Sequence, residues 1–278
     1  MRHASRSPAT EAIQADGYLA SVSDLMAGLI FVFIITVAVF ALHLATTTES
    51  LEEAKEELRS ADAIQAEIMA KVKQRIEDRL HIDVFVDEAQ GVLRLSEKGI
   101  QFASGDHRPI DGHLQHVGEL ARVLREVLPC YVSDQRVPQE TQAERRPEWC
   151  SSAPLEEEQG CDKRSARLET LLIEGHTDSQ PLGANSRARD NWDLSSMRAA
   201  EILRMIRACE PELMTLANER AVPVLSVSGY AFTRLVDTGD QRSAANRRID
   251  LRFLMELPDA VPKRMPEPAA RTKKKYEG

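Results

Sequence analysis

The stretch Ser21–Ala45, SVSDLMAGLIFVFIITVAVFALHLA, constrains this chain more than any other part of its sequence. From Leu25 to Ala45 no side chain is formally charged, and only His43, near the far end, is titratable. Because a helix rises about 1.5 Å per residue, a run of this length matches a hydrocarbon core of roughly 30 Å. The sequence therefore predicts a single transmembrane helix over residues 21–45.

Asp24 directly precedes the apolar run. A carboxylate at the edge of a membrane span is costly unless it has a partner, a water pocket or a proton. In one interpretation Asp24 caps the helix at headgroup level together with Ser21 and Ser23. In the other it takes part in ion movement, and its position alone leaves both open.

A signal peptide is an alternative interpretation of the apolar run, because Val39–Ala41 has the small-x-small form of a cleavage site. A signal peptide has an apolar region of about 7–15 residues behind a positive segment. Here the run is longer, Arg2 and Arg6 are offset by acidic residues, and Asp24 abuts the run. We therefore expect an uncleaved anchor.

Residues 1–20 are polar and predict a loose tail on the cytoplasmic side. Lysines and arginines near the span are equal in number on its two sides, Arg2 and Arg6 before it and Lys55 and Arg59 after it. The positive-inside rule therefore does not orient the helix.

After a polar break at Thr46–Glu49, residues 51–80 predict a charged amphipathic helix, so that residues 46–81 form a linker. Its narrow apolar stripe contains Leu51, Ala54, Leu58, Ala61, Ile64, Ile68, Val72, Ile76 and Leu80. The stripe either pairs with its twin in a homodimer or lies against a domain. A narrow seam suits one partner helix, so we favour the coiled coil.

The remainder predicts an α+β domain over residues 82–257. Apolar and polar residues alternate in the segments on both sides of Gly91, which indicates a hairpin. The expected elements are strands at 82–86, 92–96, 168–174, 222–230 and 247–257 and helices at 110–128 and 194–209. This order favours helices on one face of a small mixed sheet. Residues 130–167 lack periodicity and predict an inserted loop, and residues 258–278 predict a disordered tail.

The 278 residues carry a net charge of −8, which does not indicate a nucleic-acid partner. All four cysteines, Cys130, Cys150, Cys161 and Cys209, lie on the C-terminal side of the span, which is compatible with disulfides if that side is periplasmic. The expected pairs are Cys150–Cys161 within the inserted loop and Cys130–Cys209 between two helix ends.

The sequence contains no Ser/His/Asp or Cys/His arrangement typical of a catalytic site and no phosphate-binding loop. His107, His113 and His116 form its only histidine cluster, which we interpret as a solvated helix start rather than a metal site. We expect neither an enzyme active site nor a metal or organic cofactor.

Three blocks of sequence stand apart: EGHTDSQP at 174–181, NWDLSSMRA at 191–199 and NRRIDL at 246–251. They match the pattern TD…N-x-x-LS-x-x-RA…NRR at Thr177, Asp178, Asn191, Leu194, Ser195, Arg198, Ala199, Asn246, Arg247 and Arg248. This pattern resembles the OmpA-like peptidoglycan-binding domain that is shared with MotB. The resemblance covers roughly 82–257 and implies a βαβαββ fold, although the insertion at 130–167 departs from the family.

The resemblance implies a ligand site for diaminopimelate, whose free end carries an ammonium and carboxylates. Asp178 would take the ammonium and Arg198 the carboxylate, as a bidentate fork. The other implied site residues are Thr177, Asn191, Leu194, Asn246 and Arg247. Taken singly, Asp178 is better explained as a turn cap and Arg198 as part of a surface ion pair. Together, and in this order, the motif residues favour ligand binding.

The whole chain resembles MotB-type subunits, in which the aspartate at the start of the span takes and releases a translocated proton. The segment SDLMAGLIFVF is similar to the corresponding segment in the ZorB family of Zorya anti-phage systems. This resemblance implies an inner-membrane homodimer with a cytoplasmic N-terminus, a periplasmic domain, protons as coupling ion and a polytopic ZorA-like partner. A flagellar stator subunit and a passive wall anchor are the alternatives.

Overall fold

The computed structural model describes residues 8–95, 98–133, 136–138, 146–150, 152, 155, 168–183 and 186–256, with side chains from residue 22 onward. The chain divides into two compact units, of which the first contains the residues up to Glu57 and the second spans Leu58–Pro258. The predicted tail at 258–278 lies outside the described residues.

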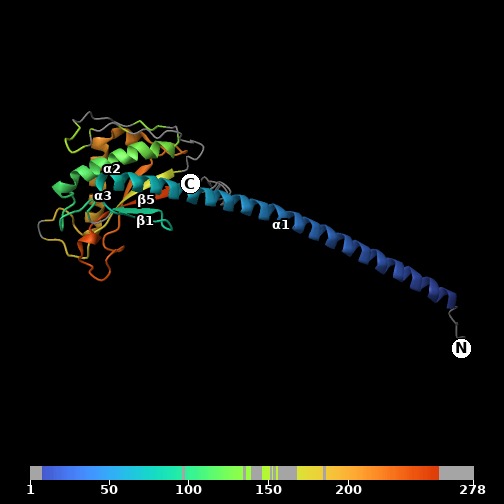
Figure 1. The fold of residues 1–278 in the computed structure, drawn as a ribbon. Coiled ribbons are helices and arrows are strands. Elements are labelled where there is room, and N and C mark those ends of the chain that lie inside the picture. The colour runs from blue at the N-terminus through green and yellow to red at the C-terminus, as the bar shows by residue number, and fades with distance from the viewer. Residues whose placement is uncertain are drawn as a thin grey trace, which may run out of the picture. The chain divides into compact units, whose positions relative to one another are not determined.

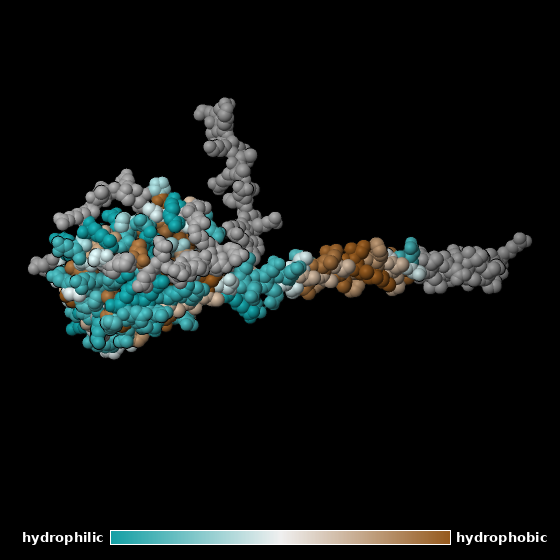
Figure 2. Space-filling view, turned by 45° about the horizontal axis from the view of Figure 1, so that its top comes forward, coloured by the Kyte–Doolittle hydropathy of each residue, from teal (hydrophilic) through white to brown (hydrophobic). Residues whose placement is uncertain are grey.

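Helix α1 (Pro8–Leu80) is the longest element of the chain (Figure 1). The helix begins at a proline, which suits the first helical turn because N–H groups there have no partner within the helix. The predicted loose tail is therefore helical from residue 8. In the first unit the apolar side chains are exposed, for example Leu25 at 72% and Phe33 at 67%, and they form the brown band of Figure 2.

Within the described residues one helix is long and apolar enough to cross a membrane, and it contains this band. None of the apolar window is buried inside the protein. Exposed apolar surface on this scale requires an apolar environment. The structure is thus consistent with the predicted single span.

The predicted polar break at 46–49 is wrong, because α1 runs through it without interruption. The hydroxyls of Thr46 and Thr47 both donate to the carbonyl of His43, at 2.9 and 2.8 Å. Thr48 donates to the carbonyl of Ala45 at 2.8 Å. These side chains bond back to their own helix instead of offering the backbone another conformation.

The coiled-coil prediction for the linker is also corrected. The second half of the stripe lies in the core of the second unit, where Ile68, Val72 and Ile76 are 0–1% exposed. Leu51, which belongs to the first unit, remains 62% exposed. The chain's own domain covers the stripe from Ala61 onward, whereas Leu58 is still 44% exposed. The compact domain begins near residue 58 rather than at 82.

A buried carboxylate also holds this part of α1 against helix α2 (Leu114–Val127). The side chain of Glu126 on α2 has no exposed surface, and it accepts from Arg75 Nη1 at 2.7 Å and from Arg79 Nη2 at 2.8 Å. Arg122 Nε lies 3.3 Å from the same carboxylate. Such charge-assisted bonds fix orientation as well as contact.

The domain contains a five-stranded sheet of order β1-β2-β5-β3-β4, which confirms the α+β fold. The strands are β1 (Val84–Asp87), β2 (Val92–Leu95), β3 (Leu168–Gly175), β4 (Leu225–Gly229) and β5 (Ile249–Met255). β3 and β4 are parallel, whereas the other neighbouring pairs are antiparallel. Gly91 closes the predicted β1–β2 hairpin with a φ of +63°, a conformation that glycine adopts without steric cost.

Helices α2 and α3 (Asn191–Cys209) connect parallel strands, from β2 to β3 and from β3 to β4. Right-handed crossovers that proceed in the same direction across the sheet place both helices on the same face. Leu251 and Phe253 of β5 are fully buried together with Leu120 and Ile202 of the two helices. This layer is the core of the domain, and β3 and β4 lead from it into the loops described below.

Neither predicted cysteine pair is formed, because Cys150 is bonded to Cys209 with the Cα atoms 5.3 Å apart. Cys130 is also in a disulfide, while Cys161 lies outside the described residues. The segment that carries Cys150 returns to the end of α3, where Arg146 pairs with Glu210 at 2.7 Å. The inserted loop therefore meets the end of α3, where the sequence predicts a bond between Cys209 and Cys130.

Candidate functional site

Two glycines position the beginning of α3 against the sheet. Gly175 of β3 and Gly229 of β4 are partners in the parallel ladder. A Cβ at Gly175 would lie 2.0 Å from the Ser195 carbonyl oxygen, and one at Gly229 would lie 2.6 Å from the Ser196 nitrogen. Only glycine permits this close approach, which brings the start of α3 to the carboxyl ends of two strands.

The fold brings the three motif blocks together at this edge. Asp178 follows β3, Arg198 lies on α3, and Arg247 lies two residues before β5. The backbone N–H of Thr177 donates to the Ala231 carbonyl at 2.9 Å, which joins the first block to the loop after β4. Segments that are distant in sequence therefore form one site.

Asp178 is 4% exposed and pairs with Arg247, whose Nη1 lies 2.9 Å from Asp178 Oδ2. Gln180 also donates to this carboxylate, from its backbone N–H at 3.2 Å and from Nε2 at 3.1 Å. The Arg247 side chain keeps 19% of its surface exposed. The ion pair at the site is therefore Asp178–Arg247.

Arg198, for which the resemblance implies contact with a ligand carboxylate, is fully buried. Its side chain has no exposed surface, and its three donor nitrogens point to backbone carbonyls. Nη1 donates to His176 O at 2.9 Å, Nε to Asp106 O at 2.9 Å and Nη2 to Ala103 O at 3.1 Å. A guanidinium offers five donors in a rigid fork, which suits several carbonyls at once.

The charge of Arg198 is maintained in this buried position. Burial lowers the pKa of Arg198 to about 10, while the nearby carboxylates of Asp178 and Asp106 act in the opposite direction. The guanidinium therefore remains protonated at neutral pH. It also lies over the Phe102 ring, 4.8 Å from the centroid, where the aromatic face favours a cation.

Two arginines thus hold residues 102–108, which we call the 102–108 loop. Arg247 Nε donates to the Phe102 carbonyl at 3.0 Å, and Arg198 binds the carbonyls of Ala103 and Asp106. The two guanidinium groups fix three carbonyls of one short segment. The loop is therefore part of the site, although no motif block includes it.

The remaining motif residues mostly support loops. Asn246 is fully buried, and its side chain bonds four backbone groups of residues 236–240. Leu194 is 2% exposed and belongs to the packed interior. Asn191 donates to Gln180 O at 3.1 Å. Among the described residues, Asn191 Oδ1 and Thr177 Oγ1 are buried without a hydrogen-bond partner.

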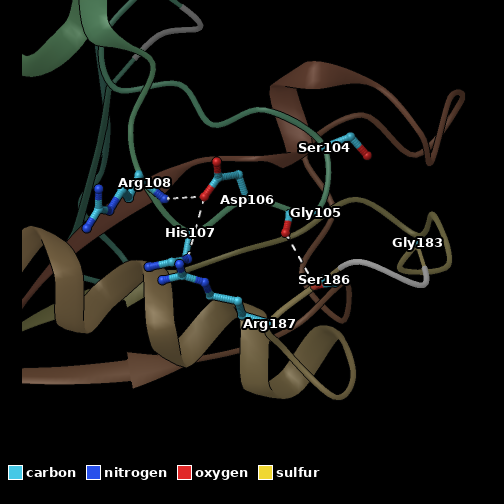
Figure 3. Close-up of a pocket in the computed structure, with 8 residues that line it drawn as sticks. All are labelled: Ser104, Gly105, Asp106, His107, Arg108, Gly183, Ser186 and Arg187. Carbon is cyan, nitrogen blue, oxygen red and sulfur yellow. Dashed lines mark hydrogen bonds and ion pairs between the residues drawn. The ribbon is translucent and has the colours of Figure 1, made fainter.

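A pocket of about 520 Å³ lies against the 102–108 loop (Figure 3). The residues that line it are Ser104, Gly105, Asp106, His107, Arg108, Gly183, Ser186 and Arg187. Ser186 Oγ donates to the Gly105 carbonyl at 3.4 Å and joins its two sides. Our sequence prediction missed this pocket; the only signal was a turn-forming glycine beside a run of charged residues.

Glu174, His176 and Asp250 form a buried cluster in which three possible metal-ligand atoms lie within 4.8 Å of one another. Arginines neutralise both carboxylates: Arg252 bonds Glu174, and Arg94 and Arg248 bond Asp250. The pKa of His176 is lowered to about 2, mainly by burial and further by the charges of these arginines and of Arg234. So much positive charge opposes a cation, and we interpret the cluster as structural.

Asp24 is exposed on α1 and has no hydrogen bond or ion pair with any residue that the structure describes. It lies directly before the exposed apolar band, as the sequence predicts. The site in the domain and this carboxylate belong to different units of the chain.

No protein-family model matches the chain, and neither does any curated protein. Similar solved structures include a MotB-like protein from Desulfovibrio vulgaris, with 18% identity over 71% of this chain and 98% of that chain and a TM-score of 0.44. The cell wall anchor of the T6SS from Pseudomonas aeruginosa has 16% identity over 68% and 97%, with a TM-score of 0.39. The periplasmic domain of Helicobacter pylori MotB has 14% identity over 60% and 78%, with a TM-score of 0.38.

Proposed function

We propose that this chain is a MotB-type membrane subunit whose domain binds peptidoglycan while Asp24 carries protons in a stator-type motor. The observation that carries this proposal is the convergence of the three motif blocks at Asp178, where Arg247 lies within 2.9 Å. The same chain provides an exposed apolar helix with a carboxylate at its edge. These parts serve a wall anchor that is coupled to the membrane.

Peptidoglycan stem peptides end in groups of both charges, which suits an acid beside a base. In the proposed complex the ligand ammonium approaches Asp178, and a ligand carboxylate approaches the exposed part of Arg247. Each of these contacts replaces part of the Asp178–Arg247 ion pair with a charge-assisted hydrogen bond to the ligand. Arg198 supports this arrangement through its hydrogen bonds to the carbonyls of Ala103, Asp106 and His176.

Asp24 is proposed as the proton carrier. A proton that neutralises Asp24 changes its interaction with a surrounding ring of a polytopic partner, and its release restores the charge. Movement of one charge across the membrane potential supplies about 2.3 kcal/mol per 100 mV, which suffices to bias a two-state contact. The anchored domain would keep the subunit still while the ring moves.

Because the residues SDLMAGLIFVF of its apolar span resemble those of ZorB proteins, we further propose a ZorB-like role in anti-phage defence with a ZorA-like partner. We tie this assignment to phage resistance that depends on Asp24. Phage plating and swimming are measured with the wild-type chain, Asp24→Asn and Asp24→Glu, each expressed with its ring partner. Loss of protection in Asp24→Asn with retention in Asp24→Glu supports the proton role.

The alternatives give different results in the same assays. A loss of swimming with unchanged phage protection indicates a flagellar stator subunit. Full activity of Asp24→Asn in both assays contradicts the proton role and leaves a passive anchor. Membrane insertion of each variant is checked by fractionation, so that a loss of activity is not confused with a loss of protein.

Wall binding is tested separately with the full chain in detergent and isolated sacculi. We expect Asp178→Asn to reduce sedimentation with sacculi at least tenfold, because it removes the charge that meets the ammonium. Arg220→Ala is the matched control, since Arg220 is exposed and its ion pair with Glu169 lies outside the motif blocks. Binding by Asp178→Asn equal to wild type would refute the site.

A further inference from the structure

Two large aromatic side chains are exposed on segments that adjoin the motif site. Trp192, in the first turn of α3, is 54% exposed, and Phe232, in the loop after β4, is 44% exposed. A single exposed ring is ordinary on a protein surface, whereas two rings held side by side indicate a contact. The question is therefore whether the fold brings these two residues together.

A buried serine joins the two backbone segments that carry the rings. Ser195 is fully buried, and its Oγ donates to the Trp192 carbonyl at 2.9 Å and accepts from the Ala231 N–H at 3.0 Å. Phe232 is the residue after Ala231. The first turn of α3 and the loop after β4 are therefore neighbours, and each presents one exposed ring.

The backbone beside Phe232 is held in a conformation that alanine rarely adopts. Ala231 has a φ of +47° and is fully buried. Its N–H is bonded to the buried serine, and its carbonyl accepts from the Thr177 N–H at 2.9 Å. Thr233 then closes a turn, because its N–H and its hydroxyl donate to the Tyr230 carbonyl at 3.1 and 2.7 Å. Backbone strain that the surroundings maintain is typical of functional surfaces, and here it fixes where Phe232 leaves the loop.

The charged groups that follow the two rings in the sequence already have partners. Asp193, next to Trp192, has a carboxylate oxygen 3.3 Å from Arg189 Nε. Arg234, two residues after Phe232, has Nη1 3.6 Å from the buried carboxylate of Glu174. These charges are compensated, so the two rings favour an uncharged ligand with an apolar face.

We infer that Trp192 and Phe232 form a sugar-binding subsite for the glycan strand of peptidoglycan. One face of a pyranose ring presents polarised C–H bonds, which stack on the negative face of an aromatic ring without net charge. Two rings suit one or two sugars, whereas a stable interface with a protein needs about 800 Å² on each partner.

The position of the rings also favours a sugar. Thr177, which binds the Ala231 carbonyl, directly precedes Asp178. In the wall each stem peptide is attached to a sugar of the strand, so a peptide held at Asp178 brings a sugar toward the adjoining loops. The inference therefore rests on the proposed peptidoglycan binding, but it concerns the sugars and not the peptide.

The test uses the full chain in detergent and two soluble wall fragments, a disaccharide muropeptide and the same stem peptide without sugars. We expect wild type to bind the muropeptide about tenfold more tightly than the free peptide, as two stacking contacts would give. The double variant Trp192→Ala/Phe232→Ala should reduce this difference to within about twofold and leave the affinity for the free peptide unchanged. Phe85→Ala is the matched control and should keep the wild-type difference, because Phe85 is 60% exposed at the opposite edge of the sheet from β4.

A double variant that keeps the full wild-type difference would overturn the subsite, and so would wild type that binds both fragments equally. If the double variant changes the oligomeric state of the chain but not this difference, the rings belong to an interface between copies, and the subsite is again overturned. Wild type that binds neither the fragments nor sacculi would instead overturn the proposed function.

Fluorescence gives a second readout that keeps both rings in place. Trp149→Phe leaves Trp192 as the only tryptophan of the chain. A sugar stacked on the indole removes water from it, so we expect the muropeptide to shift the emission to shorter wavelength and to reduce quenching by acrylamide. The free stem peptide should do neither. Unchanged emission and quenching with bound muropeptide would overturn the assignment of Trp192.

Discussion

Arg247 lies 2.9 Å from the Asp178 carboxylate and forms an ion pair across 69 residues of sequence. The same guanidinium donates to the Phe102 carbonyl at 3.0 Å. A single side chain thus connects the acid of the first motif block to the 102–108 loop. Any ligand that exchanges contacts with this pair also acts on the loop that forms the neighbouring pocket.

We predict that Gly175→Ala destabilises the domain by about 1–3 kcal/mol, because the new Cβ would meet the Ser195 carbonyl oxygen at 2.0 Å. The measurement is urea unfolding of the full chain in detergent, followed by tryptophan fluorescence. Both tryptophans lie in the second unit, so the signal reports on the domain. Gly183→Ala is the control, since nothing lies within 4 Å of its Cβ position.

Removal of the buried carboxylate at Glu126 should release the end of α1 from α2. Glu126→Ala leaves Arg75 and Arg79 without this acceptor, and loss of one partner of a buried ion pair costs about 3–5 kcal/mol. We expect earlier unfolding and faster proteolysis within residues 58–80. Glu52→Ala, which removes an exposed pair with Lys55, should leave both unchanged. Equal proteolysis of the two variants would contradict the proposed contact.

His176 should make the stability of the domain pH-dependent. Its pKa is lowered to about 2 in the folded protein, whereas an unfolded histidine has a pKa of about 6.5. Between these values the unfolded chain binds the extra proton, so stability falls as the pH is lowered from 6.5, by about 1.4 kcal/mol per unit. Urea unfolding at several pH values should show a shallower slope in His176→Gln, because the other titrating groups are shared. Equal slopes would exclude this contribution.

Peptide mapping without reduction should recover a linked pair of peptides that contain Cys150 and Cys209. The bond closes 59 residues, and removal of such a crosslink costs about 2–5 kcal/mol. We therefore expect Cys150→Ser and Cys209→Ser to unfold at similarly lowered urea concentrations. A mapped Cys150–Cys161 peptide would instead restore the pairing predicted from sequence.

Local patterns predicted the elements of this fold well. The hairpin around Gly91, the helix before Pro129 and the strands that begin at Leu168 and Ile249 are found within a few residues of their expected bounds. These elements are specified by the periodicity of neighbouring residues, which sequence displays directly. The resemblance that the motif blocks carry implied that these segments share one site.

Tertiary structure decided what each side chain contacts. The stripe that contains Ile68 and Val72 has the same sequence whether it packs on a twin helix or on its own domain, and only the position of the core selects the second. Arg198 has the charge expected of a ligand contact, but carbonyls of the 102–108 loop and of His176 accept its hydrogen bonds. Cys150 reaches Cys209 because the inserted loop folds back. Periodicity and motif order thus determined the elements and the apolar span, whereas contacts between distant segments decided the partners, because those contacts depend on packing that no local pattern encodes.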